Sequence, residues 1–252
     1  MSSDRPLAFV DLDDTLFQTA RKMAEGNPRT PVTLDVHGQP NGYMSPVQQS
    51  FINWLLATAD VVPVTARSME AYRRVTLPFA EGAICSHGGV MLSRDGSLDH
   101  TWHEQMAESL WTVQDRLSAL SEATLRIGKE LGYSLRSWVV EEKGLRQYVV
   151  TKHNESDDSV LAEVLAEIRS RGMLEGMHIH ANGNNLAFLP KGLAKRFAVQ
   201  EWLRRDRKIH GDRPVLGFGD SITDLGYMDL CHMWSTPARS QLAKVVEGLI
   251  IG

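Results

Sequence analysis

Two aspartates at the end of a short apolar run are the residues of this chain best placed for chemistry. Asp11 and Asp13 directly follow residues 7–10, a run that predicts a buried strand, and open α/β folds bind ligands at the carboxyl ends of their strands. One carboxylate of such a pair can attack phosphorus and form an aspartyl-phosphate, while the other protonates the leaving oxygen and later deprotonates water. Mg²⁺ would offset the repulsion between the carboxylates and a phosphate. The alternative is an acidic turn with a helix N-cap at Asp14 or Thr15.

A second apolar segment, residues 61–64, also ends in groups that suit a phosphate. Thr65, Ala66 and Arg67 follow it, so a hydroxyl and neighbouring backbone N–H groups stand at another strand end. These donors match the acceptor oxygens of a phosphate. We therefore expect them at the same edge of the sheet as the two aspartates.

Acids and a lysine in the last quarter of the chain extend the set. Asp220 leaves the apolar segment 215–218 and Asp224 follows one helical turn later, so both carboxylates can face one cation. Lys191 precedes a stretch with apolar residues at helical spacing. A lysine near a helix N-terminus is well placed to hold an anion, and Lys195 is the less favoured candidate for this role.

These residues resemble the haloacid dehalogenase-like (HAD) hydrolase superfamily. Its four motifs occur here in order as DLDDT, the threonine of VTARS, the lysine of PKG, and GDSITD. The resemblance covers most of the chain, and the interval between Thr65 and Lys191 is long enough for an inserted domain, as in class IIB members, which include sugar-phosphate phosphatases. It implies an α/β fold with a doubly wound, Rossmann-like core and an inserted α+β cap.

The resemblance also implies a role for each motif residue. Asp11 would be the nucleophile and Asp13 the general acid/base, while Thr65 and Lys191 would hold the phosphate. Oxygen atoms of three aspartates would bind Mg²⁺: Asp11, Asp13 through its backbone carbonyl, and Asp220. Asp224 would support the metal or orient its water.

Three positions depart from the pattern of the family. Relatives often have glycine where this chain has Asp14, so a third acid crowds the loop and is a candidate for altering metal or substrate preference. Thr223 replaces an asparagine of many class IIB relatives, and His87 replaces the asparagine of an asparagine-glycine pair. His87 is a candidate substrate contact, and a hydrogen-bonded loop histidine is an equal alternative.

The motifs divide the chain into three segments. Residues 1–86 and 188–252 form the predicted core, and residues 87–187 form the cap. Within the first segment, residues 29–45 contain a turn signal between two short runs, which predicts a hairpin flap beside the site. A disordered surface loop is an equal alternative.

The pattern within residues 87–187 predicts two helices and four strands. We expect a helix over residues 103–131, strands over 133–140 and 145–151, a helix over 159–171, and strands over 178–180 and 185–189. This order favours an antiparallel sheet covered by two helices. His178 and His180 share one strand face, but no third ligand follows at zinc-like spacing, so packing explains them better.

Composition and charge favour a small-molecule partner. The 252 residues carry a net charge of −4 without a basic run, which argues against a nucleic-acid or membrane partner. The start of the chain lacks a signal-peptide apolar region, so we expect a cytoplasmic protein. Two cysteines, Cys85 and Cys231, are too few for a disulfide framework and are expected to be reduced.

The sequence predicts a Mg²⁺-dependent phosphatase that hydrolyses a small phosphorylated metabolite, with a phosphosugar the leading substrate class. A hexose-phosphate mutase or phosphotransferase on the same core is the enzymatic alternative. A phospho-accepting switch that signals by conformation is an alternative from another class, although such modules are usually much shorter. A silent binding protein fits least, because all four chemical positions are filled.

Overall fold

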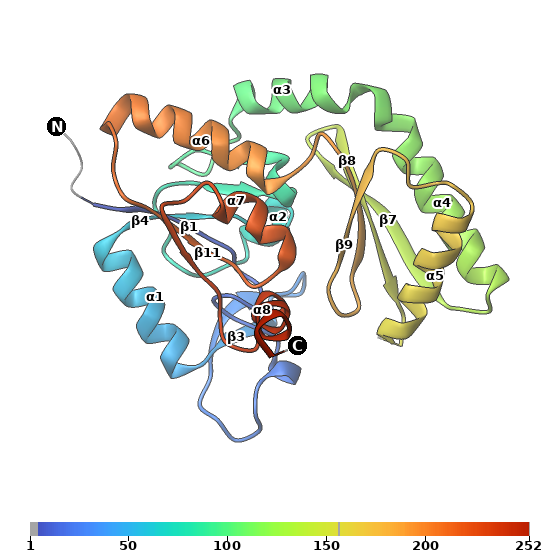
Figure 1. Ribbon diagram of the computed structural model, residues 1–252, viewed down its shortest axis with the longest axis horizontal. Helices are drawn as coiled ribbons and strands as arrows, with labels where there is room; N and C mark the ends of the chain where they lie inside the picture. Colours follow the sequence, from blue (N-terminus) through green and yellow to red (C-terminus); the bar gives the residue numbers. More distant parts are fainter. Residues whose placement is uncertain (1–4, 156, 252) are drawn as a thin grey trace. The chain divides into compact units, whose positions relative to one another are not determined.

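The computed structural model describes residues 5–155 and 157–251 (Figure 1). By its internal contacts the chain divides into two compact units, residues 1–99 with 195–252, and residues 100–194. The first boundary lies after 99 rather than after 86, because β5 (Ala83–Cys85) continues into a hairpin with β6 (Val90–Leu92). The second lies after 194 rather than after 187, at the residue before α6 (Lys195–His210).

A parallel four-stranded sheet forms the centre of the first unit. Its order is β12 (Met233–Ser235), β11 (Val215–Phe218), β1 (Leu7–Val10) and β4 (Asp60–Pro63). All four residues of β1 are buried, as expected for a strand that is covered on both faces. Because the strands are parallel, the residues that follow β1, β4 and β11 come to the same edge of the sheet.

Helices pack on both sides of this sheet (Figure 1). On one side, α1 (Pro46–Thr58) buries Ile52 and Leu55 against Val10 and neighbouring strand residues. The helix begins with a capping box between Ser45 and Gln48. On the other side lies α6, and the unit also contains short helical segments and a last helix: η1 (Ala20–Lys22), α2 (Met69–Tyr72), η2 (Ser86–Gly88), η4 (Ile222–Asp224), α7 (Leu225–Met228) and α8 (Gln241–Ile251).

The segment 29–45 forms the expected hairpin. Strands β2 (Thr30–Leu34) and β3 (Pro40–Met44) pair antiparallel with an irregular register. The hairpin is joined to the loop that follows Asp13, because Gln18 and Tyr43 exchange two backbone hydrogen bonds of 3.0 and 2.8 Å. The predicted flap is therefore attached to the loop that carries the candidate catalytic acids.

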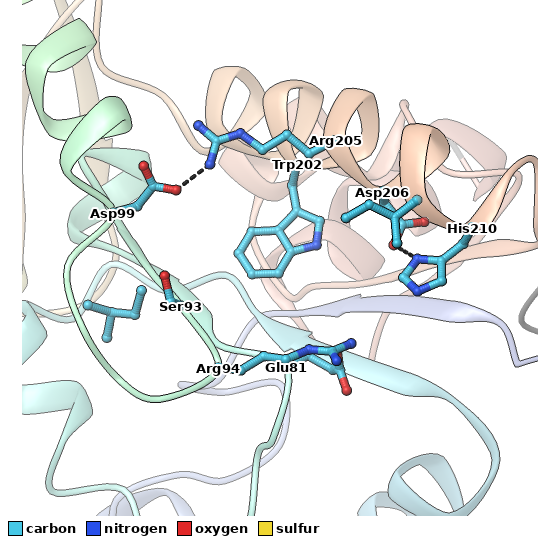
Figure 2. Close-up of a pocket in the computed structure, with 10 residues that line it drawn as sticks. Glu81, Ser93, Arg94, Asp99, Trp202, Arg205, Asp206 and His210 are labelled. Carbon is cyan, nitrogen blue, oxygen red and sulfur yellow. Dashed lines mark hydrogen bonds and ion pairs between the residues drawn. The ribbon is translucent and has the colours of Figure 1, made fainter.

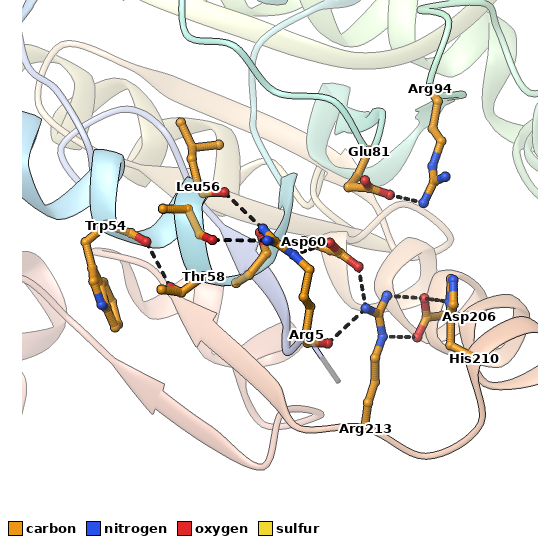
Figure 3. A network of polar contacts seen from close by, with 12 residues as sticks. Arg5, Trp54, Leu56, Thr58, Asp60, Glu81, Arg94, Asp206, His210 and Arg213 are labelled. Atoms are coloured by element: carbon orange, nitrogen blue, oxygen red, sulfur yellow. Dashed lines mark hydrogen bonds and ion pairs between the residues drawn. The ribbon is translucent and has the colours of Figure 1, made fainter. Parts of the chain in front are cut away.

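An ion-pair network holds the edge of the sheet where the strands begin (Figure 3). The guanidinium group of Arg213 donates to both carboxylate oxygens of Asp206, the Nε bond being 2.9 Å, and to Asp60 at the start of β4. Arg5 pairs with the same Asp60 and donates to carbonyl groups at the end of α1. The side chain of Arg213 is only 2% exposed, so its charge depends on these carboxylates for compensation.

The second unit is an antiparallel sheet covered by helices. Its strands, in the order β7-β8-β10-β9, are β7 (Leu135–Glu142), β8 (Leu145–His153), β10 (Leu186–Pro190) and β9 (Met177–Ala181). Two helices, α4 (Gln114–Glu130) and α5 (Asp158–Ser170), share a core with the sheet. Its buried members include Leu117, Val149, Val164 and Phe188.

The predicted helix over residues 103–131 is interrupted. It consists of α3 (His100–Leu110), a 3₁₀ turn η3 (Trp111–Val113), and α4. The backbone leaves the α conformation at Leu110 and Val113, where ψ is close to zero. The Gln114 side chain bridges the interruption by donating to the carbonyl oxygens of Leu110 and Arg146, at 3.1 and 2.9 Å. A tertiary contact that periodicity does not reveal therefore replaces the helical hydrogen bonds.

Both cysteines are free, Cys85 buried and Cys231 half-buried. Among the described residues, the structure has no helix with the length and apolar character needed to cross a membrane.

Candidate active site

Three carboxylates meet at the edge of the core sheet where its strands end. Oxygen atoms of Asp11, Asp220 and Asp224 lie within 4.8 Å of one another, and all three residues are buried. Asp11 follows β1, and its backbone N–H donates to the carbonyl of Phe218 on β11, 2.8 Å away. This pairing of neighbouring parallel strands places Asp11 beside Asp220, and Asp224 returns to the cluster at the end of η4.

Lys195 lies among these acids. Its Nζ atom is 2.7 Å from Asp11 Oδ1 and 2.6 Å from Asp224 Oδ1, and its side chain is 7% exposed. Burial lowers the pKa of this lysine, but the charges of Asp11 and Asp224 outweigh burial and raise its pKa above the ordinary value. Lys195 is therefore a charged group, held by two carboxylates at the first residue of α6.

The structure places Lys195, rather than Lys191, beside the acids. Lys191 is exposed, lies in the turn after Pro190 in the unit of residues 100–194, and is not the start of a helix. Lys195 occupies the position at the start of α6 that was expected of Lys191, because α6 begins four residues later than predicted. The signal was present in the sequence: Lys195, Ala198 and Val199 stand at helical spacing and form the buried face of α6.

The acid cluster fits a divalent cation. Three carboxylates lie together with a single ammonium group, which contacts two of them, so the cluster has more acids than cations and offers oxygen ligands of the type that Mg²⁺ prefers. Burial, aided by the charges of Asp224 and Asp14, raises the pKa of Asp220 to about 7. Burial also outweighs the attraction of Lys195, so the pKa of Asp11 lies well above its usual value. A bound cation would favour the ionised form of both groups.

Both carboxylate oxygens of Asp224 accept hydrogen bonds. One carboxylate oxygen binds Lys195, and the other accepts from the Ser221 hydroxyl at 2.6 Å and from the Ser221 backbone N–H at 3.0 Å. Thr223, which departs from the family pattern, lies 2.9 Å from the Ser221 hydroxyl. Gly219 makes this packing possible, because a Cβ atom there would lie 2.5 Å from that of Asp224.

Asp13 points to a different partner. Its half-exposed carboxylate accepts two hydrogen bonds from Arg67, with Nε at 2.7 Å and Nη2 at 2.8 Å. The guanidinium also lies over the ring of Phe17, 5.2 Å from its centroid. Arg67, expected as a phosphate-binding group, therefore contacts the candidate general acid/base.

Thr65 is buried at the end of β4, as expected from its position. Its hydroxyl oxygen accepts the Arg67 backbone N–H at 3.1 Å, and its carbonyl accepts the His87 backbone N–H at 3.1 Å. Ala66 lies between Thr65 and Arg67 in sequence. The motif thus forms a tight turn, in which hydrogen bonds hold the backbone on both sides of Ala66.

His87 lies next to this turn in a left-handed backbone conformation, with φ of 56°. His87 is buried, with 4% of its surface exposed. This burial fits the second of the two alternatives, a hydrogen-bonded loop histidine. Ser86 shares the left-handed conformation and donates its backbone N–H to the Arg67 carbonyl at 2.7 Å. The φ angles of Ser86, His87 and Gly88 are all positive, so the chain turns sharply here.

Other residues of the cluster carried weaker sequence signals. The Thr15 hydroxyl donates to Asp11 Oδ2 at 3.2 Å, although the sequence pointed to it only as a possible N-cap. Ser221 and Tyr227 contact Asp224 and Lys195, respectively, with Lys195 Nζ 5.7 Å from the centre of the tyrosine ring. Serine and tyrosine are common residues, and only the fold brings these two to the acids.

A separate cavity of about 400 Å³ lies along the second half of α6 (Figure 2). Trp202 projects into it, and Glu81 and Asp99 on its wall pair with Arg94 and Arg205. The residues that line it include none that the four motifs supply. Its ionic groups bind one another, so the acid cluster rather than this cavity is the candidate active site.

Solved structures show which fold this arrangement belongs to. No protein-family model matches the chain, and no curated protein sequence does. The sucrose-phosphatase of Synechocystis sp. PCC6803, solved with sucrose and phosphate, is 13% identical with a TM-score of 0.53, over 99% of this chain and 98% of that one. The IMP-nucleotidase of Plasmodium falciparum, a mutant with bound IMP, is 15% identical with a TM-score of 0.55, over 98% and 68%.

A third similar structure is the C-terminal domain of trehalose-6-phosphate phosphatase from C. albicans. It is 17% identical with a TM-score of 0.50, over 90% of this chain and 74% of that one. At these identities the likeness establishes the fold. The chain has the fold of these solved structures, an α/β core with a parallel central sheet, which confirms the predicted fold class.

Proposed function

We propose that this protein is a Mg²⁺-dependent phosphatase that hydrolyses a small phosphorylated metabolite through an aspartyl-phosphate on Asp11. The observation that carries the proposal is the gathering of Asp11, Asp220 and Asp224 at the carboxyl edge of the sheet, with Lys195 bonded to Asp11 and Asp224. A packing role alone would not favour three buried acids around one lysine, because burial of surplus charge is costly.

The first step would be the attack of Asp11 on the phosphorus atom of the substrate. Lys195 and the Thr15 hydroxyl hold its two carboxylate oxygens at 2.7 and 3.2 Å, so the side chain is oriented before substrate arrives. Bound Mg²⁺ would supply positive charge between the acids and the phosphate and would be held by Asp11, Asp220 and the Asp13 backbone carbonyl. Thr65 and the neighbouring backbone N–H groups would donate to the phosphate oxygens.

Asp13 would exchange protons with two oxygen atoms, that of the leaving group and that of the attacking water. It would give a proton to the leaving oxygen as the phosphorus–oxygen bond breaks, and it would later take a proton from the water that attacks the aspartyl-phosphate. The second step releases inorganic phosphate and restores the Asp11 carboxylate. In the structure both Asp13 oxygens bind Arg67, so this pair would have to loosen as Asp13 becomes protonated.

A phosphosugar is the substrate class that we favour. The similar structures include phosphatases named for sucrose phosphate and trehalose 6-phosphate, and an IMP-nucleotidase, all of which act on small phosphorylated molecules. The unit of residues 100–194 carries none of the acids of the cluster, and we assign to it the recognition of the non-phosphate part of the substrate.

A panel of phosphorylated metabolites tests the reaction and the substrate together. The purified protein should release inorganic phosphate from at least one sugar phosphate with Mg²⁺, and chelation of the metal should stop the release. Asp11→Asn, which nearly preserves the shape of the side chain, should remove turnover. An isomeric sugar phosphate as product would instead favour a mutase. Phosphate release that persists in Asp11→Asn, with deamidation and contaminating enzyme excluded, would overturn the proposal.

A further inference from the structure

Asp14 has a strained backbone in the loop that carries the candidate catalytic acids. Its φ angle is 63°, in the left-handed region that glycine adopts freely and other residues adopt at a cost. A carboxylate here also adds negative charge to a loop that already carries Asp11 and Asp13. Strain at such a place favours a functional reason for the side chain.

The Asp14 side chain forms an ion pair with a lysine eight residues later in the chain. Lys22, the last residue of η1, forms an ion pair with Asp14 Oδ2. The backbone of Asp14 is fixed as well, because its N–H donates to the carbonyl of Phe17 at 2.8 Å. The Asp14 side chain is 22% exposed, so solvent screens its charge only in part. The pair therefore places a carboxylate and its counter-charge at a fixed position beside the acid cluster.

Asp14 directly follows Asp13, whose backbone carbonyl is a proposed Mg²⁺ ligand, so its carboxylate lies in the loop next to the ion site. An ion held by that carbonyl lies in the field of the Asp14 carboxylate. Left alone, a carboxylate at this place would attract a divalent cation and repel a phosphate.

We infer that Asp14 and Lys22 form a charge-balancing pair that sets the affinities of the site for Mg²⁺ and for phosphate in opposite directions. The inference rests on the proposed function and extends it to two residues outside the proposed set of metal ligands and phosphate donors. Lys22 offsets part of the field of Asp14, so that phosphate can bind while Asp14 keeps its place in the loop. Lys22 ends η1, which lies in sequence between the loop of the acids and the hairpin of residues 29–45.

Removal of the lysine charge separates the two effects. In Lys22→Met the unpaired Asp14 should tighten Mg²⁺ binding and weaken phosphate binding, each by about three- to tenfold for a charge a few ångströms beyond contact. Loosening of the loop would weaken both ligands together. Opposite shifts are therefore a signature that a purely structural role would not produce.

The experiment measures both affinities on the whole protein. Calorimetry gives the Mg²⁺ dissociation constant without substrate, and inorganic phosphate is the second probe, titrated at saturating Mg²⁺. The variants are Lys22→Met, Asp14→Gly and their combination, with Arg21→Met as the matched control, because Arg21 is also exposed and adjacent in sequence. Raised salt should shrink the shifts, since screening weakens interactions between exposed charges.

The pair is supported if Lys22→Met moves the two affinities in opposite directions, Arg21→Met moves neither, and Asp14→Gly in the Lys22→Met background restores the values of Asp14→Gly alone. Parallel shifts, or none, in a protein whose parent binds both ligands would overturn this inference and leave the proposed function intact. A parent that bound neither Mg²⁺ nor phosphate would overturn both.

Discussion

At the scale of single residues, Lys195 is the most consequential side chain of the site. A buried ammonium contacts two buried carboxylates, so each group depends on the other for compensation of its charge. Removal of one member leaves an uncompensated charge in the interior. The free energy that this charge costs is larger than the net stabilisation that the pair contributes. The same contacts fix the orientation of Asp11, the proposed nucleophile.

Lys195→Met and Lys191→Met form a matched pair that tests the corrected assignment. Lys195→Met should lower phosphatase turnover by roughly 10² to 10³ fold, as expected for the loss of a preorganised charge at a reacting group. Its thermal stability should also fall. Lys191→Met changes an exposed side chain and should stay within about 0.5 kcal/mol of the parent in stability.

Activity assays and thermal unfolding on the same preparations provide the measurement. If Lys191→Met lost turnover while Lys195→Met kept it, the sequence assignment would be right and the structural one wrong.

Asp220 gives the metal-free protein a defined pH dependence. Its folded pKa of about 7 lies above the usual 3.8. Below about pH 4 both states are protonated, and between pH 4 and 7 only the unfolded state ionises, so this residue lowers stability as pH rises to 7. Asp220→Asn should therefore raise the free energy of unfolding at pH 8 by about 2 to 4 kcal/mol, with little effect at pH 4.

Urea unfolding in a chelator, at both pH values, checks this prediction. Mg²⁺ should remove the advantage of the variant at pH 8, because a cation that binds only the folded parent stabilises it. An equal change at pH 4 and pH 8 would show that the effect does not come from the Asp220 charge.

The sequence predicted most members of the acid cluster because the acids follow apolar runs directly. Asp11 and Asp220 leave strands whose ends meet in any doubly wound sheet, so position along the chain was enough. Lys195 was not preferred, because the choice depends on where α6 begins. Arg67 was placed near the site, but its contact with Asp13 depends on side-chain geometry that no spacing rule provides.

At the scale of elements, the core sheet depends on polar contacts at the edge away from the acids. Arg213 joins Asp206 on α6 to Asp60 at the start of β4 and to the Arg5 carbonyl before β1. The network ties one helix to two strands (Figure 3). Because α6 carries Lys195 at its other end, the network also supports the position of that lysine.

Arg213→Met should destabilise the protein by about 3 to 5 kcal/mol, because two largely buried carboxylates lose the guanidinium that joins them and keep the more exposed Arg5 and His210. Arg207→Met is the control, since Arg207 on α6 pairs with Asp212 and both side chains are exposed, and such a pair contributes about 1 kcal/mol or less. Chemical denaturation of both variants measures the difference. Equal losses would mean that the buried network contributes no more than a surface ion pair.

Periodicity predicted α5 and the four strands of the antiparallel sheet to within a few residues. Periodicity failed where a tertiary contact decides the backbone. The interruption between α3 and α4 depends on the contact of Gln114 with Arg146, which lies 32 residues away. The hairpin of residues 29–45 was one of two open alternatives, and its pairing with Gln18 settles which of them the chain adopts.

At the scale of the whole molecule, the chain divides into two units, and we propose that one performs the chemistry while the other recognises the substrate. The acids, Thr65 and Lys195 all lie in the unit of residues 1–99 and 195–252. The other unit has its own core beneath α4 and α5. The predicted boundaries, after residues 86 and 187, come before those of the structure, after residues 99 and 194. The amino-acid composition does not change sharply at the β5–β6 hairpin or at the turn before α6, so the sequence did not mark these places.

Replacement of residues 100–194 by a short Gly/Ser linker tests the division of labour. The shortened protein should still hydrolyse a small activated aryl phosphate, because it keeps every proposed catalytic group. It should lose its ranking among phosphorylated metabolites, since it loses contacts to the rest of the substrate. A folded, shortened protein that retained the ranking of the parent would place specificity in the core, with the hairpin of residues 29–45 the first candidate.

The central claim is that Asp11 becomes covalently phosphorylated during turnover. Rapid acid quench of the enzyme with its best substrate, followed by mass spectrometry of the peptide that contains Asp11, tests it directly. The account predicts one phosphoryl group on Asp11, more of it in Asp13→Asn because the water step is slowed, and none in Asp11→Asn. Turnover that proceeds with an unmodified Asp11 peptide, in a protein whose Asp11→Asn variant remains active, would contradict it.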